Sequence, residues 1–380
     1  MKKILAPTLG LMLLGTIGKA APFMAVGDGA ELFVTGNIGL RSDDNIFLLN
    51  QAESDVILEV TPGAELAFGK NAQLKGSLAA NCAFTNYFDH DELNTTLAGV
   101  DFLASYDDSK LKLRLNSGYH ELNQNTADVR PTGLTPRLTR RDVFTASVGG
   151  EVEVSQLTSV GTGVDFDHEN YKRSGYGDSD DLSVPVNFYY KWTPKVDLSL
   201  GYRYRSYQTT IGQDSTDHFF NIGARGDFTP KLTGTFAVGY TTRDLKGTNP
   251  TTGRRDESRS QLGLDASFSY EVSAKTSLQL GVSNDFGTSP QGQQQRNFTI
   301  NTALRSKFSA EWEGNVGVSY RAIGYGTRTD DYYEGNVGAT YVWNANLRVI
   351  GAYTYRSYNS DLSGSDFRNN VFSIAANFRY

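Results

Sequence analysis

The stretch Val371-Phe372-Ser373-Ile374-Ala375-Ala376-Asn377-Phe378-Arg379-Tyr380 decides the fold. Side chains alternate between the two faces of a strand. One face therefore carries only apolar and aromatic side chains, at 372, 374, 376, 378 and 380. One interpretation is an edge strand of a soluble sandwich, but a soluble sheet rarely leaves such a row uncovered. In a bilayer the row faces lipid, and Tyr380 lies among the aromatic residues of the interface.

The rest of the chain repeats one unit: a strand-like run, a very short turn, another run and a longer polar loop. The short turns are predicted at 69–71, 107–110, 155–158, 193–195, 229–231, 273–275, 309–311 and 344–346. The longer loops are predicted at 42–54, 89–92, 123–139, 172–181, 212–216, 246–256, 288–295, 327–330 and 359–366. Outer-membrane barrels have this asymmetry, with short turns on the periplasmic side and long loops outside.

Counting the runs predicts an all-β fold: a transmembrane antiparallel up-and-down β-barrel of about 18 strands, or roughly 16 if the first pair is irregular. An even number places both chain ends on the periplasmic side. A propeller is the soluble alternative, because its blades also repeat at about 40 residues. Propeller strands are short, however, whereas these runs are long enough for tilted strands that cross a bilayer.

The two faces of each run differ in polarity. Leu198, Leu200 and Tyr202, for example, alternate with Ser199 and Arg203. A soluble barrel of this size would bury that polar face without partners, at a cost of several kcal/mol per ion. A wide aqueous lumen hydrates it instead. This contrast is the strongest sequence argument for a membrane barrel.

The composition fits an exported membrane barrel. Residues 1–20 are predicted to be a cleaved signal peptide, with Lys2 and Lys3 before an apolar core and Ala20 before the cut. Residues 21–30 are expected to be a short periplasmic segment, and 31–380 a single barrel domain. The net charge of −6, without any lysine- or arginine-rich block, argues against nucleic-acid binding. We expect the outer membrane of a Gram-negative-type cell, with outer-membrane lipid as a partner.

Charged residues on the inward faces are the candidate pore-lining residues. The basic ones come from the second half of the chain: Arg203, Arg205, Arg225, Arg243, Arg305, Arg321, Arg356 and Arg379. The acidic ones come from the first half: Glu151, Glu153, Asp165, Asp167 and Glu169. Closing the barrel would set an acidic wall against a basic one, a transverse field that orients dipolar solutes. The alternative is that these charges pair with one another along the wall.

The segment 123–139 is the predicted constriction loop. It is the longest of the polar loops, carries Arg130 and Arg137, and is followed directly by Arg140 and Arg141. Folded into the lumen, it would narrow the pore.

No motif for catalysis, metal or cofactor binding is present. The four histidines are scattered without metal-ligand spacing. Asp165-Phe166-Asp167-His168-Glu169 lies on an alternating strand and lacks the glycine turn of a calcium loop. There is no nucleophile elbow and no phosphate loop. The sequence thus predicts no enzyme and no cofactor.

One short motif resembles a known family. Gly39-Leu40-Arg41-Ser42-Asp43-Asp44-Asn45-Ile46-Phe47, just after the first strand, followed by a full barrel pattern and an aromatic terminus, resembles the outer-membrane β-barrel porin 2 family. An Asx turn is the plainer interpretation of Asp43-Asp44-Asn45. The resemblance implies a barrel associated with exopolysaccharide export. The terminal strand also resembles the signal that the barrel-assembly machinery recognises in outer-membrane proteins.

Together these features predict a porin for passive or gated diffusion of small polar solutes or saccharides. The alternative is a plugged barrel that acts as a surface-binding or structural protein. The solute, the ion selectivity and the oligomeric state are left open.

Overall fold

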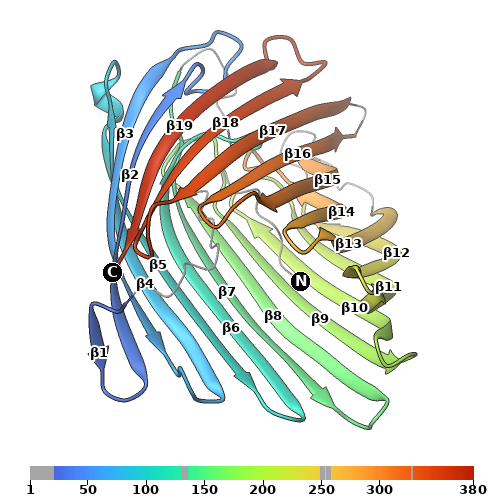
Figure 1. The fold of residues 1–380 in the computed structure, drawn as a ribbon. Helices are drawn as coiled ribbons and strands as arrows, with labels where there is room; N and C mark the ends of the chain where they lie inside the picture. Colours follow the sequence, from blue (N-terminus) through green and yellow to red (C-terminus); the bar gives the residue numbers. More distant parts are fainter. Residues whose placement is uncertain (1–20, 130–135, 249–252, 254–257, 327) are drawn as a thin grey trace.

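The computed structural model describes residues 21–129, 136–248, 253, 258–326 and 328–380, and these form a closed antiparallel barrel (Figure 1). The first nine strands are β1 (Met24–Val26), β2 (Ala30–Asp43), β3 (Asp55–Phe68), β4 (Leu74–Tyr87), β5 (Thr95–Asp107), β6 (Leu111–Asn123), β7 (Arg140–Glu153), β8 (Thr158–Tyr171) and β9 (Ser179–Lys191). The next five are β10 (Val196–Thr209), β11 (Asp214–Thr229), β12 (Leu232–Lys246), β13 (Arg259–Ser273) and β14 (Thr276–Thr288). The last five are β15 (Gln294–Lys307), β16 (Trp312–Tyr325), β17 (Arg328–Val342), β18 (Leu347–Asn359) and β19 (Phe367–Arg379). A 3₁₀ turn, η1 (Asp91–Leu93), lies between β4 and β5.

The predicted strand number is confirmed. In the described part of the chain, β2 to β19 make an 18-stranded barrel in which each strand pairs with its sequence neighbours and β19 pairs with β2. Each of the eight predicted short turns lies at a junction between two strands at one end of the barrel. The remaining connections lie at the other end, and most of them are longer. The predicted loops at 327–330 and 212–216 are shorter than expected, because β17 begins at Arg328 and β11 begins at Asp214. We call these the short-turn end and the long-loop end.

The outward face is apolar along the length of the barrel. On β19, the side chains of Phe372 and Ile374 are 60% and 56% exposed, which is the arrangement expected of groups that contact lipid. Trp192 and Trp343, at the short-turn end, are even more exposed, at 67% and 66%. They form part of an aromatic girdle. No helix in the described residues is long and apolar enough to cross a membrane.

Near the N-terminus, the structure adds a strand that the sequence did not predict. The signal peptide predicted at 1–20 lies outside the described residues. Within the predicted periplasmic segment 21–30, β1 pairs with the start of β2, from Met24 opposite Leu32 to Val26 opposite Ala30. This hairpin extends β2 at the short-turn end.

The seam between the first and last barrel strands is bonded along its length. At the short-turn end, the backbones of Val34 and Tyr380 exchange hydrogen bonds of 2.7 and 2.9 Å. Beside them, the Arg379 guanidinium donates to Glu65 on β3 at 3.1 and 3.2 Å. The same guanidinium lies 3.5 Å from the ring centroid of Phe33. One inward arginine thus joins β19, β2 and β3.

At its long-loop end, the seam is fastened by the Asp43-Asp44-Asn45 motif. The Asn45 side chain donates to the carbonyls of Leu49 (2.7 Å) and Arg368 (2.8 Å). Asn369 on β19, fully buried, donates to the Asp43 carboxylate at 2.6 Å. An Asx turn is present as well, since the Asn45 N–H donates to Asp43. The motif therefore does more than turn the chain: it bonds the first strand to the last.

Replacing Asn369 with alanine should weaken this seam. The substitution removes the donor to buried Asp43 and the acceptor that Arg356 Nη1 uses at 3.1 Å. Unsatisfied buried partners of this kind cost about 1–3 kcal/mol. Urea unfolding in detergent, followed by tryptophan fluorescence, measures the loss. The matched control is Asn370→Ala, whose side chain bonds exposed Asp44. Equal stability of the two variants would contradict the role given to Asn369.

Candidate functional site

Three apolar residues of the β2–β3 loop turn inward at the long-loop end. Ile46, Phe47 and Leu48 are each at most 6% exposed, although most of the other residues in their loop are polar. Ile46 and Phe47 pack with Ile57 and Tyr87 of the barrel wall. This apolar run was visible in the sequence, but the alternation rule does not apply to loops. Its inward turn was therefore not predicted from the sequence.

The described residues that precede 130 in the β6–β7 segment, the predicted constriction loop, also lie inside the barrel. The Asn125 side chain donates to the carbonyl of Phe47 at 2.9 Å and is 6% exposed. Further along, Asp128 accepts a hydrogen bond from Arg321 on β16. β16 is the ninth strand after β7 in a ring of 18, so the two lie on opposite walls. The stretch from the end of β6 to Asp128 thus spans the interior from one wall to the other.

The arginines predicted for this loop are placed differently from one another. Arg130 lies outside the described residues. Arg137 is exposed, and its carbonyl accepts from Asn125. Arg140 bonds Glu121 at 3.4 Å and shares the outward side of β7 with Phe144, so it does not point into the lumen. The next residue, Arg141, is 5% exposed and bonds the Gln124 carbonyl. Asp128 and Arg141 are therefore the charged residues that the structure places in the interior here.

Several predicted basic residues form one buried ion network on β10 to β12. Arg205 Nε and Arg243 Nε each donate to Asp217 at 2.7 Å, and all three residues are at most 3% exposed. Arg203 and Arg205 also bond Asp285 of β14, at 2.6 and 3.2 Å. β14 is not adjacent to these strands, so the bonds must run along the inner face. The shared carboxylate of Asp217 went unpredicted, although its inward position follows from the alternation.

A second group of charges lies nearer the short-turn end. Arg225 donates to both oxygens of Glu151 (2.6 and 2.7 Å) and to Asp197 (3.0 Å), and its guanidinium lies 3.4 Å from the Tyr189 ring centroid. Glu153 pairs with Lys191 at 3.3 Å. The predicted acidic and basic sets therefore meet here, in direct contact and not across a lumen.

The remaining predicted residues are more dispersed. Asp165 accepts from Ser147 at 2.6 Å, and Asp167 lies beside it on the same face of β8, opposite Thr145. Arg356 pairs with Glu334 at 3.0 Å. Arg305 is exposed and has no carboxylate within ion-pair distance among the described residues. Of the two arrangements left open by the sequence, pairing along the wall describes most of these charges. Their role in lining a conducting pore stays a prediction.

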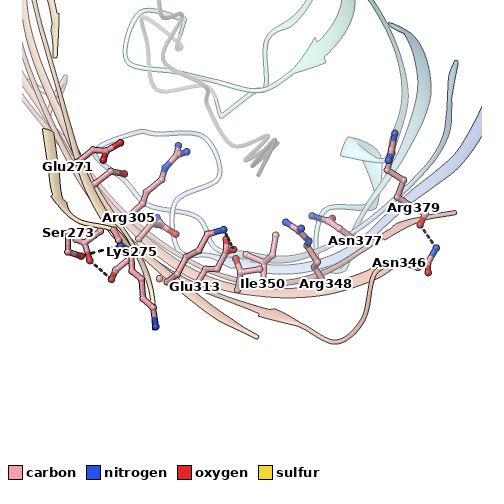
Figure 2. Close-up of a pocket in the computed structure, with 18 of the residues that line it drawn as sticks. Glu271, Ser273, Lys275, Arg305, Glu313, Asn346, Arg348, Ile350, Asn377 and Arg379 are labelled. Atoms are coloured by element: carbon pink, nitrogen blue, oxygen red, sulfur yellow. Dashed lines mark hydrogen bonds and ion pairs between the residues drawn. The ribbon is translucent and has the colours of Figure 1, made fainter. Parts of the chain in front are cut away.

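A recess lies on the inner wall at the short-turn end. It has a volume of about 340 Å³ and is formed by the ends of β13 to β19, with Arg305, Arg348 and Arg379 on its rim (Figure 2). We call it the short-turn recess. Strand alternation predicts that Arg305 and Arg379 face inward, but it does not predict that both line one recess. No group of three or more histidine, cysteine or acidic side chains in the described residues is placed to hold a metal.

His90 fastens the β4–β5 loop to the inward β2–β3 loop. Its Nδ1 lies 2.8 Å from Asp55, its Nε2 lies 3.3 Å from Glu53, and its ring meets Phe47 edge-on at 5.8 Å. The hydrogen bond to Asp55, with Glu53 and Glu92 nearby, raises the pKa of His90 above its ordinary 6.5.

The His90 contacts predict a pH dependence of stability. Because the folded pKa is raised, the stabilisation is fully present below pH 6.5 and is lost as the pH rises through the folded pKa. Unfolding measured between pH 5 and 8 should show this loss in the wild type and not in His90→Gln. A wild type and variant with parallel pH profiles would rule out the contribution.

Asp217→Asn should destabilise the barrel strongly. It leaves two buried guanidinium groups without their shared anion, and removing one partner of a buried pair costs about 3–5 kcal/mol. Urea unfolding measures the change. Asp197→Asn is the control, because Asp197 and Arg225 are both partly exposed and Arg225 keeps Glu151. A loss no larger than that of the control would overturn this account.

Comparisons with solved structures show broad similarity to other barrels. OpdK, an outer membrane protein of Pseudomonas aeruginosa, matches over 92% of this chain and 99% of its own, with a TM-score of 0.47 and 11% identity. OccAB3 of Acinetobacter baumannii matches over 93% and 100%, with a TM-score of 0.48 and 8% identity. OpdQ of Pseudomonas aeruginosa matches over 93% and 100%, with a TM-score of 0.47 and 12% identity. No curated protein matches the sequence significantly.

The family assignment comes from the sequence. The family model described as "Putative beta-barrel porin 2" matches residues 22–380, which is the described barrel from end to end. It agrees with the closed 18-stranded architecture, the lipid-facing outer surface and the resemblance carried by Asp43 to Phe47. The model is one of porins and not of enzymes. The chain therefore belongs to the β-barrel porin 2 family, as an outer-membrane β-barrel of the Gram-negative type.

Proposed function

We propose that this barrel is a channel for small polar solutes whose outer part is narrowed by its own loops. One observation carries the proposal: the interior is polar and charged, yet the β6–β7 segment crosses it and binds the opposite wall through Asp128 and Arg321. A charged interior favours water and polar solutes over apolar ones. A segment that spans it reduces the free cross-section and can regulate passage.

Saccharides are the solute class that the inner wall favours. On β15 to β17 this wall carries neutral hydrogen-bonding groups, with Ser319 bonded to Asn301 at 2.6 Å and Asn315 bonded to Asn336 at 3.2 Å. Amides and hydroxyls both donate and accept, so they can replace the water around sugar hydroxyls. A link to exopolysaccharide export stays a prediction.

The second candidate is a plugged barrel that binds a partner at its surface. It is favoured by loop contacts over the long-loop end. The Gly177 N–H donates to the Pro290 carbonyl at 2.7 Å, which joins the β8–β9 and β14–β15 loops. A Cβ on Gly212 would lie 2.7 Å from the Gly292 backbone, so the β10–β11 loop packs there too. Three loops thus meet over the interior.

Planar-bilayer recording of the refolded mature chain separates these two functions. A channel should give discrete conductance steps, with the current carried through a polar lumen. The folding of the barrel is verified by its heat-modifiable migration in electrophoresis. A folded barrel that gives no conductance steps at any voltage would support the plugged barrel.

Asp128→Asn should increase the conductance or the fraction of time spent open. The substitution removes the anion that holds the β6–β7 segment to Arg321, so the segment should spend more time away from the opposite wall. Lys70→Gln is the matched control. It breaks an exposed ion pair with Glu31 at the short-turn end, away from the β6–β7 segment. Unchanged steps in Asp128→Asn would show that this contact does not narrow the channel.

A further inference from the structure

The short-turn recess has an unusual balance of charge. Its lining includes five cationic side chains and two carboxylates: Lys275, Arg305, Lys307, Arg348, Arg379, Glu271 and Glu313. Glu313 lies 3.4 Å from Lys307. Arg379 is held by Glu65 and by the Phe33 ring, so its orientation is fixed. Because cationic side chains outnumber carboxylates in its lining, the recess is locally positive. In the rest of the described interior, by contrast, most arginines bond a carboxylate.

Arg305 is the group that makes the recess available to a ligand. It lies on the inward face of β15, is exposed, and has no carboxylate partner among the residues that the structure describes. In Figure 2 the side chains of Arg305, Arg348 and Arg379 project to the same open side of the wall. A guanidinium in this setting has donors in a planar fork that fits a carboxylate.

The rest of the lining is mostly neutral and polar, with three apolar side chains, those of Ala274, Ile350 and Phe378. Asn315, Asn377, Ser277 and Thr340 come from four different strands, and Ile350 lies between the arginines. Amide and hydroxyl groups suit the hydroxyls of a sugar, and an aliphatic side chain suits its C–H face. The volume of about 340 Å³ lies at the small end of the usual range for ligand sites.

From this combination, we propose that the short-turn recess binds an acidic monosaccharide, its carboxylate on Arg305 and its hydroxyls on the neighbouring amides. This assignment rests on the proposed channel and names its solute class. The recess lies on the inner wall at the short-turn end, where a solute passes between the lumen and the periplasm. It would raise the local concentration of anionic sugars there and favour them over neutral ones.

Equilibrium binding tests the proposal without depending on conductance. The full mature barrel in detergent is titrated with D-glucuronate, D-glucose and inorganic phosphate by calorimetry. Glucuronate should bind more tightly than both. Arg305→Gln should weaken glucuronate binding by about tenfold or more, the loss expected for one charge-assisted contact. The matched control is Arg114→Gln, on the inward face of β6 outside the recess, which should bind like the wild type.

Each outcome decides between the alternatives. Equal binding of glucuronate and glucose, or equal losses in the two arginine variants, overturns the proposal. Phosphate binding that matches glucuronate shows a general anion site and overturns the sugar assignment. Bilayer recordings of the same proteins then distinguish a failure of the binding-site proposal from a failure of the channel proposal. Conductance without glucuronate binding supports the channel and contradicts the binding site in the recess. Glucuronate binding without conductance contradicts the channel and supports the binding site.

Discussion

A bilayer offers no hydrogen-bond partners to a polypeptide backbone, and this constraint determines the architecture. Every strand of the barrel must be paired on both sides, so β19 has to meet β2. The side chains that fasten this seam come from both of its ends. Asp43, Asn45 and Asn369 bond it near the loops, and Arg379 bonds it near the short turns. The motif and the terminal strand, far apart in the sequence, are thus two halves of one structural element.

The interior follows from a second constraint. Eighteen strands enclose more space than apolar side chains could fill, so the inner face carries polar groups that need water or one another. Near the loops they find one another, as in the network of Arg205, Asp217 and Arg243. Near the short turns, Arg225 and Arg379 are also paired with carboxylates, whereas Arg305 stays exposed. The two ends of the barrel therefore differ in one respect: loops cross the interior at the long-loop end, and an exposed arginine without a carboxylate partner among the described residues lies at the short-turn end.

The strand number, the short turns and the outward face could be predicted from the sequence, because alternation and turn residues are local signals. Which charged residues pair with which could not be predicted from the sequence. Asp285 meets Arg203 across 82 residues, and Asp128 meets Arg321 across 193, which depends on barrel curvature and loop path. Arg140 and Arg141 were both assigned to the constriction loop, whereas they begin β7, whose alternation turns Arg140 outward and Arg141 inward. The inward turn of Ile46 to Leu48 was also not predicted, because side-chain alternation applies to strands and these residues lie in a loop.

The seam also has a consequence for how the barrel is made. Asp44 and Asn370, which bond each other, are 326 residues apart in the chain, whereas every other barrel strand pairs with the next one along. Hairpins can thus form early and locally, but closure joins the most distant segments and has the largest loss of chain entropy. Until that step, β2 and β19 are two unpaired edges able to pair with any other strand. The hydrogen bonds from the Asp43-Asp44-Asn45 motif to β19 form only when the barrel closes, so they stabilise the closed barrel against reopening into a state with two free edges.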